Sequence, residues 1–555
     1  MVGSALCDAI TSTNSSTVNV TVNPSIGGEW KEVGKTTVAA MHIVLVRPTK
    51  ILIIDKAEKN PDAVYPDGRY AFSSEYDLTT GKSRTLNLKT NTFCSAGSFF
   101  ENGTLIESGG AENTFGAQKG FQSVRLFTSC DDDNCDWLEF PSYMKSLRWY
   151  NTMATLPDGR VFDIGGSTEA ISVNDDAVNN PTYEFFPKGS DNSSSVKFQF
   201  LVDTLPYNLY PSVFVLPGPP NQTWLYMSAN KKAIIWDYVA QKIVKTLPDI
   251  PGGPRTYPLT GTIFLLPLHY ENNYTAEIVA CGGSAAQKPD SKSENDCARL
   301  NLALPNSNWT LESFGDFDTG RLMGDYIHMP DGKVLIVNGA GMGYAGWDKG
   351  DTTNRQHVAR LPQKIPLLYD PKAPNGSRFT RMAEAKYVRV YHSTATLIPD
   401  GTVFISGSNP NAAYCATCEY PTEYRVEIFT PPYLLNGTPR PIIRNIAGTT
   451  VFNSLIPIQT TYGEIVTILI DLDDPTASIT AALINHGFVT HSQHMSARYV
   501  SLQIQNQIPI PSGYAVDVSL PPHPNIMPPG RHLYIYILNK GTPANTAIEI
   551  NLKRS

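Results

Sequence analysis

The sequence has little charge, and its deficits exclude several classes of protein. Asp, Glu, Lys and Arg make up 17% of the 555 residues, and the net charge at pH 7 is −7. No basic stripe is present to neutralise phosphates, which argues against a nucleic-acid partner. No polybasic run indicates an anionic membrane. No apolar run approaches the ~20 residues that a membrane-spanning helix needs.

Helical periodicity and two common catalytic motifs are also missing. No long i, i+3, i+4 apolar stripe persists, and the short alternating apolar segments are separated by Gly and Pro, which is typical of an all-β protein. No G-x-G-x-x-G follows a strand into a helix, so a nicotinamide or flavin oxidoreductase is not expected. No G-x-S-x-G lies in the context of a nucleophile elbow, so serine-based hydrolysis is unsupported.

The amino terminus lacks the apolar segment of a signal peptide, yet other features indicate secretion. We expect an extracellular glycoprotein whose leader is absent from this chain, with a polar segment over residues 1–25 and no amino-terminal carbohydrate-binding domain. A single N-x-S/T sequon means little, but nine of them in expected turns favour glycosylation. They begin at Asn14, Asn19, Asn102, Asn192, Asn221, Asn273, Asn308, Asn375 and Asn436.

Six of the eight cysteines form pairs that are close in sequence and flank turns or loops. The pairs are Cys130 with Cys135, Cys281 with Cys297, and Cys415 with Cys418. In an oxidising compartment three short-range disulfides are expected. A zinc site at the C-x₂-C pair is disfavoured because no second pair lies at metal-finger spacing. Cys7 keeps an open role, and Cys94, inside an apolar segment, needs a separate explanation.

One pattern recurs along most of the chain: an apolar strand, a turn such as Pro-Asp-Gly, a second apolar strand, then small residues. Seven such units begin at Ala39, Phe93, Tyr150, Leu209, Leu259, Asp325 and Tyr391. Intervals of roughly 50–65 residues fit four-stranded blades, so residues 26–436 are predicted to form a seven-bladed kelch-type β-propeller. The alternative is a pair of β-sandwiches with coincidental hairpins. Residues 437–555 lack the blade pattern, and their regular short strands predict an immunoglobulin-like β-sandwich.

Histidine and tyrosine gather at two places. His486, His491 and His494 lie close together in the second region, and Tyr391-His392 opens the seventh repeat. A lone strand histidine is more often structural than a ligand. Adjacent strand residues point to opposite faces, so Tyr391 and His392 could share a metal only where the backbone turns into the central channel.

Four sequence blocks resemble the copper radical oxidases, the family of galactose oxidase and glyoxal oxidase. They are TFCSAGSF, LRWYNTMATLPDGRVFDIGGS, VRVYHSTATLIPDGTVFISGSNP and HGFVTHSQHMSARYV, in the order that the family has them. The resemblance runs from about Gly28 to the end of the chain. The segment VNGAGMGYAGW, from Val337 to Trp347, resembles the glyoxal oxidase branch in particular.

The resemblance implies a site. Cys94 and Tyr150 match the residues that form a thioether cross-link on which a radical is held. Tyr391 and His392 match a ligand pair, and His491 matches a ligand supplied by the second domain. One Cu(II) would then be bound by Tyr150, Tyr391, His392 and His491, a set of imidazoles and phenolates that suits tetragonal Cu(II).

Roles follow from the same resemblance. Tyr391 would accept the substrate's proton, Tyr150 would abstract the C–H hydrogen, and O₂ would leave as H₂O₂. His486 and His494 do not match the motif histidine and are taken as supporting or structural residues. His328, in the strand before MPDG, is expected in the core.

The substrate side departs from galactose oxidase. That enzyme carries a tryptophan over the cross-link in a G-G-S-W stretch, whereas this chain has Thr168 after Gly165-Gly166-Ser167. Threonine cannot stack as an indole does. A small aldehyde of the glyoxal or methylglyoxal type, reacting as its hydrate, is therefore expected. The alternatives are an oxidase of primary alcohols or sugars, and a kelch binding module without metal. We expect a monomer, coupled to peroxidases that consume H₂O₂.

Overall fold

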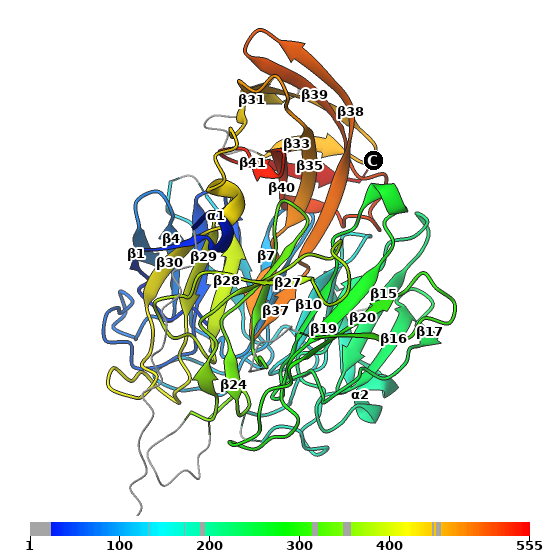
Figure 1. Cartoon of the computed structure of the whole chain (residues 1–555). Helices are drawn as coiled ribbons and strands as arrows, with labels where there is room; N and C mark the ends of the chain where they lie inside the picture. The colour runs from blue at the N-terminus through cyan, green and yellow to red at the C-terminus, as the bar shows by residue number, and fades with distance from the viewer. Residues whose placement is uncertain are drawn as a thin grey trace, which may run out of the picture.

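The computed structural model describes residues 24–130, 132–170, 172–188, 195–313, 320–347, 357–446, 449–450 and 457–554. Seven four-stranded antiparallel blades form a β-propeller, and a β-sandwich-like domain lies against it (Figure 1). Both parts of the predicted fold class are thus confirmed. The domain limits taken from the sequence, 26–436 and 437–555, remain predictions, and strands β30 (Arg425–Thr430) and β31 (Ile442–Ile446) lie on either side of that limit.

The first three blades follow one another without a crossover. Blade 1 has β2 (His42–Arg47), β3 (Lys50–Ile54), β4 (Ser73–Asp77) and β5 (Lys82–Thr85). Blade 2 has β6 (Ala96–Phe99), β7 (Leu105–Ser108), β8 (Val124–Phe127) and β9 (Leu138–Phe140). Blade 3 has β10 (Thr152–Thr155), β11 (Val161–Ile164), β12 (Thr182–Phe186) and β13 (Val196–Lys197).

Blades 4 to 6 repeat the arrangement. Blade 4 has β14 (Ser212–Val215), β15 (Trp224–Ala229), β16 (Lys232–Asp237) and β17 (Lys242–Thr246). Blade 5 has β18 (Thr262–Leu265), β19 (Glu277–Cys281), β20 (Asp296–Asn301) and β21 (Thr310–Ser313). Blade 6 has β22 (Asp325–His328), β23 (Val334–Val337), β26 (Leu367–Tyr369) and β27 (Phe379–Arg381), with the separate pair β24 (Ala340–Met342) and β25 (Arg360–Pro362).

Blade 7 closes the ring with strands from both ends of the propeller sequence. It contains β28 (Ser393–Leu397), β29 (Val403–Gly407) and β30, and its outer strand is β1 (Glu29–Lys35), which pairs antiparallel with β30. Because the amino-terminal strand completes the last blade, the ring is held shut by main-chain hydrogen bonds. The helices are minor: α1 (Pro24–Gly27), α2 (Gln199–Asp203), and the 3₁₀ turns η1 (Tyr270–Asn272) and η2 (Pro432–Leu434).

Turn chemistry explains why the repeats fold as hairpins. Between β10 and β11, Asp158 accepts a hydrogen bond from the Arg160 amide at 3.0 Å, and Gly159 has φ +82°. This left-handed conformation costs glycine nothing. The Gly-Gly stretches that follow the second strands allow close backbone approach. A Cβ at Gly110 would lie 2.0 Å from the carbonyl oxygen of Asn91, and one at Gly166 would lie 2.8 Å from that of Trp149.

The sandwich-like domain is built around one long strand whose two halves pair with different neighbouring strands. The first half of β38 (Arg498–Ile510) pairs with β35 (Ile479–Asn485), and its second half pairs with β39 (Gly513–Ser519). A register shift between Ile504 and Asn506 marks a bulge in the second half. The other strands are β32 (Thr449–Thr450), β33 (Ile458–Thr461), β34 (Ile465–Asp471), β40 (Gly530–Asn539), β41 (Thr542–Pro543) and β42 (Ile548–Lys553), with β31.

A hairpin between β35 and β38 leaves this domain and joins the propeller. It consists of β36 (Phe488–Thr490) and β37 (Gln493–Met495), and β36 pairs with β2, so that blade 1 becomes a six-stranded sheet. In Figure 1 the orange strand β37 lies among the blades, well below β31, β38 and β39. The sheet of blade 1 therefore contains strands from both domains.

The covalent predictions are confirmed where the structure describes them. All three disulfides are present: Cys130–Cys135, Cys281–Cys297 and Cys415–Cys418. Cys94 is free and buried, while Cys7 lies outside the described residues. Asn14, Asn19 and Asn192 also lie outside them, and the other six sequon asparagines are exposed. Within the described residues no helix has the length and apolarity to cross a bilayer.

Candidate active site

Each blade places one buried side chain two residues before its innermost strand. Those strands begin at His42, Ala96, Thr152, Ser212, Thr262, Asp325 and Ser393. The corresponding side chains are Ala40, Cys94, Tyr150, Tyr210, Thr260, Met323 and Tyr391, all of them buried. Three of the residues predicted from the sequence thus occupy the same structural position in blades 2, 3 and 7. The side chains of Cys94, Tyr150 and Tyr391 lie in one buried cluster.

The backbone at this place is strained. Positive φ angles occur at Cys94 (+56°), Tyr150 (+65°), His392 (+62°), His491 (+48°) and Ser492 (+65°). Each such angle costs a non-glycine residue on the order of 1–3 kcal/mol, and such residues cluster at functional sites. In the hairpin β36–β37, His491 and Ser492 are the two turn residues between Thr490 and Gln493. Positive φ at both is the requirement of a type I′ turn, which projects His491 from the hairpin tip.

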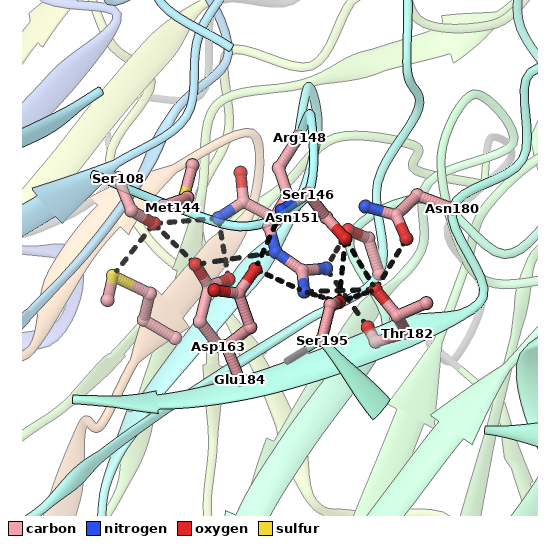
Figure 2. A network of polar contacts seen from close by, with 12 residues as sticks. Ser108, Met144, Ser146, Arg148, Asn151, Asp163, Asn180, Thr182, Glu184 and Ser195 are labelled. Carbon is pink, nitrogen blue, oxygen red and sulfur yellow. Dashed lines mark hydrogen bonds and ion pairs between the residues drawn. The ribbon is translucent and has the colours of Figure 1, made fainter. Parts of the chain in front are cut away.

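A buried ion network fixes the backbone on both sides of Tyr150 (Figure 2). The Arg148 guanidinium donates to the Gly165 carbonyl at 2.8 Å and to Glu184 Oε1 at 3.1 Å. Asn151 Nδ2 donates to Asp163 Oδ1 at 2.7 Å. Burial raises the pKa of Asp163 to about 6, against the opposing effect of the nearby Arg148 charge. Because the residues before and after it are anchored, Tyr150 can hold its left-handed conformation.

His392 presents one free ring nitrogen. Its Nδ1 lies 2.9 Å from the backbone oxygen of Asn409, so Nδ1 carries the proton and donates it. Its Nε2 is buried and has no hydrogen-bond partner among the described residues. The ring stacks on Tyr391, with centroids 3.7 Å apart and an interplanar angle of 28°. The Nε2 nitrogen is therefore available to bind a metal.

His491 is oriented by a side chain of its own hairpin. Its Nδ1 lies 2.5 Å from Thr490 Oγ1, and its Nε2 lies 3.4 Å from Cys94 Sγ. The ligand atoms of Cys94, His392 and His491 all lie within 4.8 Å of one another. In both histidines Nδ1 is held by a neighbouring oxygen. The Nε2 atom of each ring is therefore the one that can bind a metal.

Two phenols complete the cluster. The Tyr150 and Tyr391 hydroxyl oxygens are 3.3 Å apart, and the Tyr150 amide donates to the Cys94 carbonyl at 2.9 Å. The structure therefore brings together all five residues predicted from the sequence, although they come from blades 2, 3 and 7 and from the hairpin β36–β37.

Burial sets the protonation of this cluster. It lowers the pKa of His392 and of His491 well below the ordinary histidine value. It raises the pKa of Cys94, Tyr150 and Tyr391 well above their ordinary values. The imidazoles are therefore neutral and free to bind a metal. Deprotonated phenols would need a nearby cation to compensate for burial.

The three other histidines that were singled out from the sequence have partners outside this cluster. His494, at the far side of the hairpin tip, pairs with Asp325 at 3.5 Å, and His486 Nε2 lies 3.1 Å from the Tyr536 hydroxyl. His328 is buried, and its Nε2 donates to the Leu265 carbonyl at 2.9 Å. These contacts agree with the structural roles expected for all three.

Sequence reasoning missed Tyr257, which lies in the loop between β17 and β18. The Tyr150 hydroxyl donates to the Tyr257 hydroxyl at 2.7 Å, and the two rings are stacked at 4.1 Å and 26°. A signal was present: Arg255 precedes Tyr257 by two residues, as Arg148 precedes Tyr150 and Arg389 precedes Tyr391. All three arginines are buried.

The stacking position over Tyr150 is therefore filled. Thr168 does not stack, as expected, and its hydroxyl donates to the Val178 carbonyl at 3.2 Å. Instead, Tyr257 packs on one face of Tyr150, and the Trp149 ring lies 4.3 Å from the Tyr150 ring, centroid to centroid. Tyr257 comes from the loop between blades 4 and 5, whereas Thr168 lies between β11 and β12 of blade 3.

Comparison with known proteins agrees with this architecture. Residues 41–433 match the family model of the glyoxal oxidase N-terminus, and residues 449–550 match a galactose oxidase-like, Early set domain. An aldehyde oxidase of Arabidopsis thaliana is 35% identical over 86% of this chain and 74% of its own length. An aldehyde oxidase of Vitis pseudoreticulata is 32% identical over 93% and 96%.

A solved structure shows the same fold. A fungal alcohol oxidase in complex with copper superposes with a TM-score of 0.67 at 20% identity, covering 95% of this chain and all of that one. At this identity the likeness concerns the fold alone. The family matches and the aldehyde oxidase relatives together show that this chain is an oxidoreductase of the copper radical oxidase family, in its glyoxal oxidase branch.

Proposed function

We propose that the chain binds one Cu(II) through Tyr150, Tyr391, His392 and His491, and oxidises small aldehydes, as their hydrates, to carboxylic acids. O₂ is the electron acceptor and H₂O₂ the second product. The observation that carries the proposal is the convergence of Cys94, His392 and His491, whose ligand atoms all lie within 4.8 Å of one another. The buried Nε2 of His392 has no hydrogen-bond partner among the described residues, and the Tyr391 ring stacks on the same imidazole.

The donor set fits copper. Neutral imidazoles and phenolates suit tetragonal Cu(II). Both imidazoles are oriented by a contact at Nδ1, as metal-binding histidines commonly are. When bound, the copper would accept one of the two electrons that leave the substrate. The second must be accepted elsewhere, and a radical on the Tyr150 ring is the proposed acceptor.

Two tyrosines would then remove the two hydrogens of the substrate. Tyr391 Oη takes the proton of the substrate hydroxyl, and Tyr150 takes the hydrogen atom from the substrate carbon. An aldehyde hydrate loses two hydrogens to become a carboxylic acid, and O₂ gains two to become H₂O₂, so the reaction balances. Burial of the cluster keeps bulk water away from the radical and strengthens the electrostatic contacts in it.

Cys94 is proposed to be linked to Tyr150 through a thioether. Forming the link removes the thiol hydrogen and one ring hydrogen, both of which O₂ accepts. The competing possibility is that Cys94 stays a thiolate ligand, because its Sγ lies 3.4 Å from His491 Nε2. Intact mass after copper loading in air separates the two, since only the cross-link lowers the mass by two hydrogen atoms.

The aldehyde preference rests on kinship. The two relatives named above are called aldehyde oxidases and align over most of their length, whereas a galactose oxidase of Gibberella zeae is 25% identical. Six exposed sequons and three disulfides support a secreted, extracellular glycoprotein. We further propose that it acts as a monomer beside peroxidases that use its H₂O₂.

The test is a panel of substrates with copper-loaded protein and H₂O₂ detection. Glyoxal and methylglyoxal should give the highest kcat/KM, ahead of benzyl alcohol, glycerol and galactose. Cys94→Ser should give no mass loss and little H₂O₂ with any of them. A preference for galactose or a primary alcohol would overturn the aldehyde assignment. No H₂O₂ with any substrate and no mass loss would overturn the oxidase assignment and favour a binding propeller.

A further inference from the structure

Tyr257 is held over the cluster by its own buried anchor. The Arg255 guanidinium donates to both carboxylate oxygens of Asp296 at 2.9 Å and to the Pro251 carbonyl at 2.9 Å. Thr256 Oγ1 donates to the Tyr207 carbonyl at 2.6 Å. Tyr257 itself is 5% exposed. The loop is thus fixed on the amino-terminal side of the tyrosine, as the chain before Tyr150 is fixed by Arg148.

Two separate contacts join Tyr257 to Tyr150. The rings are stacked at 4.1 Å and 26°, so one face of the Tyr150 ring is covered by carbon rather than water. The hydroxyl oxygens are 2.7 Å apart, closer than the 3.3 Å between Tyr150 and Tyr391. The Tyr257 hydroxyl also lies 3.4 Å from that of Tyr391.

The direction of this hydrogen bond is decided by protonation. Once Tyr150 is a phenolate or a phenoxyl radical it has no proton to donate, so the Tyr257 hydroxyl must be the donor. A donor stabilises the charged phenolate more than the neutral radical, because hydrogen bonds to ions are the stronger ones.

We propose that Tyr257 is a positioning and tuning residue for the Tyr150 radical: its hydroxyl raises the reduction potential of the radical, and its ring protects it from solvent. This inference rests on the proposed function. The hydroxyl and the ring of Tyr257 thus have separate effects. The ring covers the face of Tyr150 that Thr168 does not cover.

Two variants separate the parts. Tyr257→Phe keeps the ring and removes the hydroxyl, so the radical should become easier to form. The equilibrium between radical and reduced protein should shift by about tenfold, which corresponds to about 59 mV for one electron. The lifetime of the radical should not fall. Tyr257→Leu removes the ring as well, and the lifetime should fall at least several-fold because water reaches the exposed face.

A matched control is available in Tyr210→Phe. Tyr210 is equally buried and lies edge-on to Tyr150 with centroids 5.3 Å apart, but its hydroxyl donates to the Ser95 carbonyl. This control should leave the potential of the radical unchanged. The measurements are a redox titration followed by the optical band of the radical, its decay in air-saturated buffer, and the intact mass of each copper-loaded protein.

The outcomes separate this inference from the proposed function. If the unaltered protein shows neither the loss of two hydrogens nor a radical band, both proposals fall. If it shows them, and Tyr257→Phe has the same potential as Tyr210→Phe, only the tuning role falls. Equal radical lifetimes in Tyr257→Phe and Tyr257→Leu would overturn the shielding role. Thermal unfolding of each variant confirms that the fold is intact.

Discussion

The two histidines of the cluster come from regions that are built differently. His392 belongs to a blade, next to a repeated position before the innermost strand, and its Nδ1 is held by a backbone carbonyl. His491 belongs to a hairpin of the sandwich-like domain, and its Nδ1 is held by the hydroxyl of Thr490. The blade ligand is fixed by the fold itself, whereas the hairpin ligand depends on one side chain and on docking against β2.

This difference implies that the two halves of the site fail in different ways. Substitutions in a blade act through backbone geometry and stability, while substitutions in the hairpin act on metal affinity with the propeller intact.

The largest effect is expected from His491→Ala. Loss of a direct ligand should lower copper affinity by more than the roughly 10–100-fold that loss of an outer partner costs. The matched control is His494→Ala in the same hairpin, which should leave copper affinity unchanged but lower the unfolding temperature, because Asp325 loses its buried partner. Equal copper affinity in the two variants, measured by competition with a chelator, would contradict the ligand assignment.

Arg148→Met should disrupt the blade side. Removing the arginine of a buried ion network leaves Asp163 without a charged partner and Glu184 with Lys188 alone, at a cost of about 3–5 kcal/mol. The radical yield should fall with it, since Tyr150 loses its anchor. Arg160→Met in the same blade is the control. Arg160 pairs with Asp158 at the surface, where such pairs contribute about 0–1 kcal/mol. Similar losses in urea unfolding would disprove the role of the network.

Thr490→Val sharpens the comparison at the hairpin. The shape of the side chain is kept, but His491 loses the oxygen that orients its ring. Copper affinity should fall by about 10–100-fold, the usual cost of losing an outer hydrogen-bond partner. Thr394→Val, in the inner strand of blade 7, removes only a hydroxyl that donates to the Ala40 carbonyl at 3.1 Å. If both variants bind copper equally well, orientation of His491 by Thr490 is unimportant.

The smallest effect at any single pH step concerns Asp163. Its pKa is raised from 3.8 to about 6 in the native protein, so between those pH values the native state binds more protons than the unfolded chain. Stability therefore falls as pH rises through this window, by at most about 1.4 kcal/mol per pH unit. Asp163→Asn should lack this component. The difference in unfolding free energy between the two proteins should thus change between pH 4 and 6 and stay constant above.

Much of the architecture was predictable from the repeats. Seven Gly-punctuated hairpins predicted seven blades, and the cysteine spacing predicted all three disulfides. The closure of blade 7 by β1 was not predicted, because Glu29–Lys35 carries no blade pattern and pairs with a strand almost 400 residues away. Insertion of the hairpin β36–β37 into blade 1 was missed for the same reason.

The sequence alone supplied the residues of the proposed site, because the motifs that resemble the family are local properties. Cys94, Tyr150, Tyr391, His392 and His491 could be named without coordinates. Tertiary structure decided that they share one buried volume, and that Tyr257 rather than residue 168 covers the Tyr150 ring. Packing of this kind depends on contacts between loops of different blades. The periodicity of the repeats does not specify which of these loops contacts Tyr150.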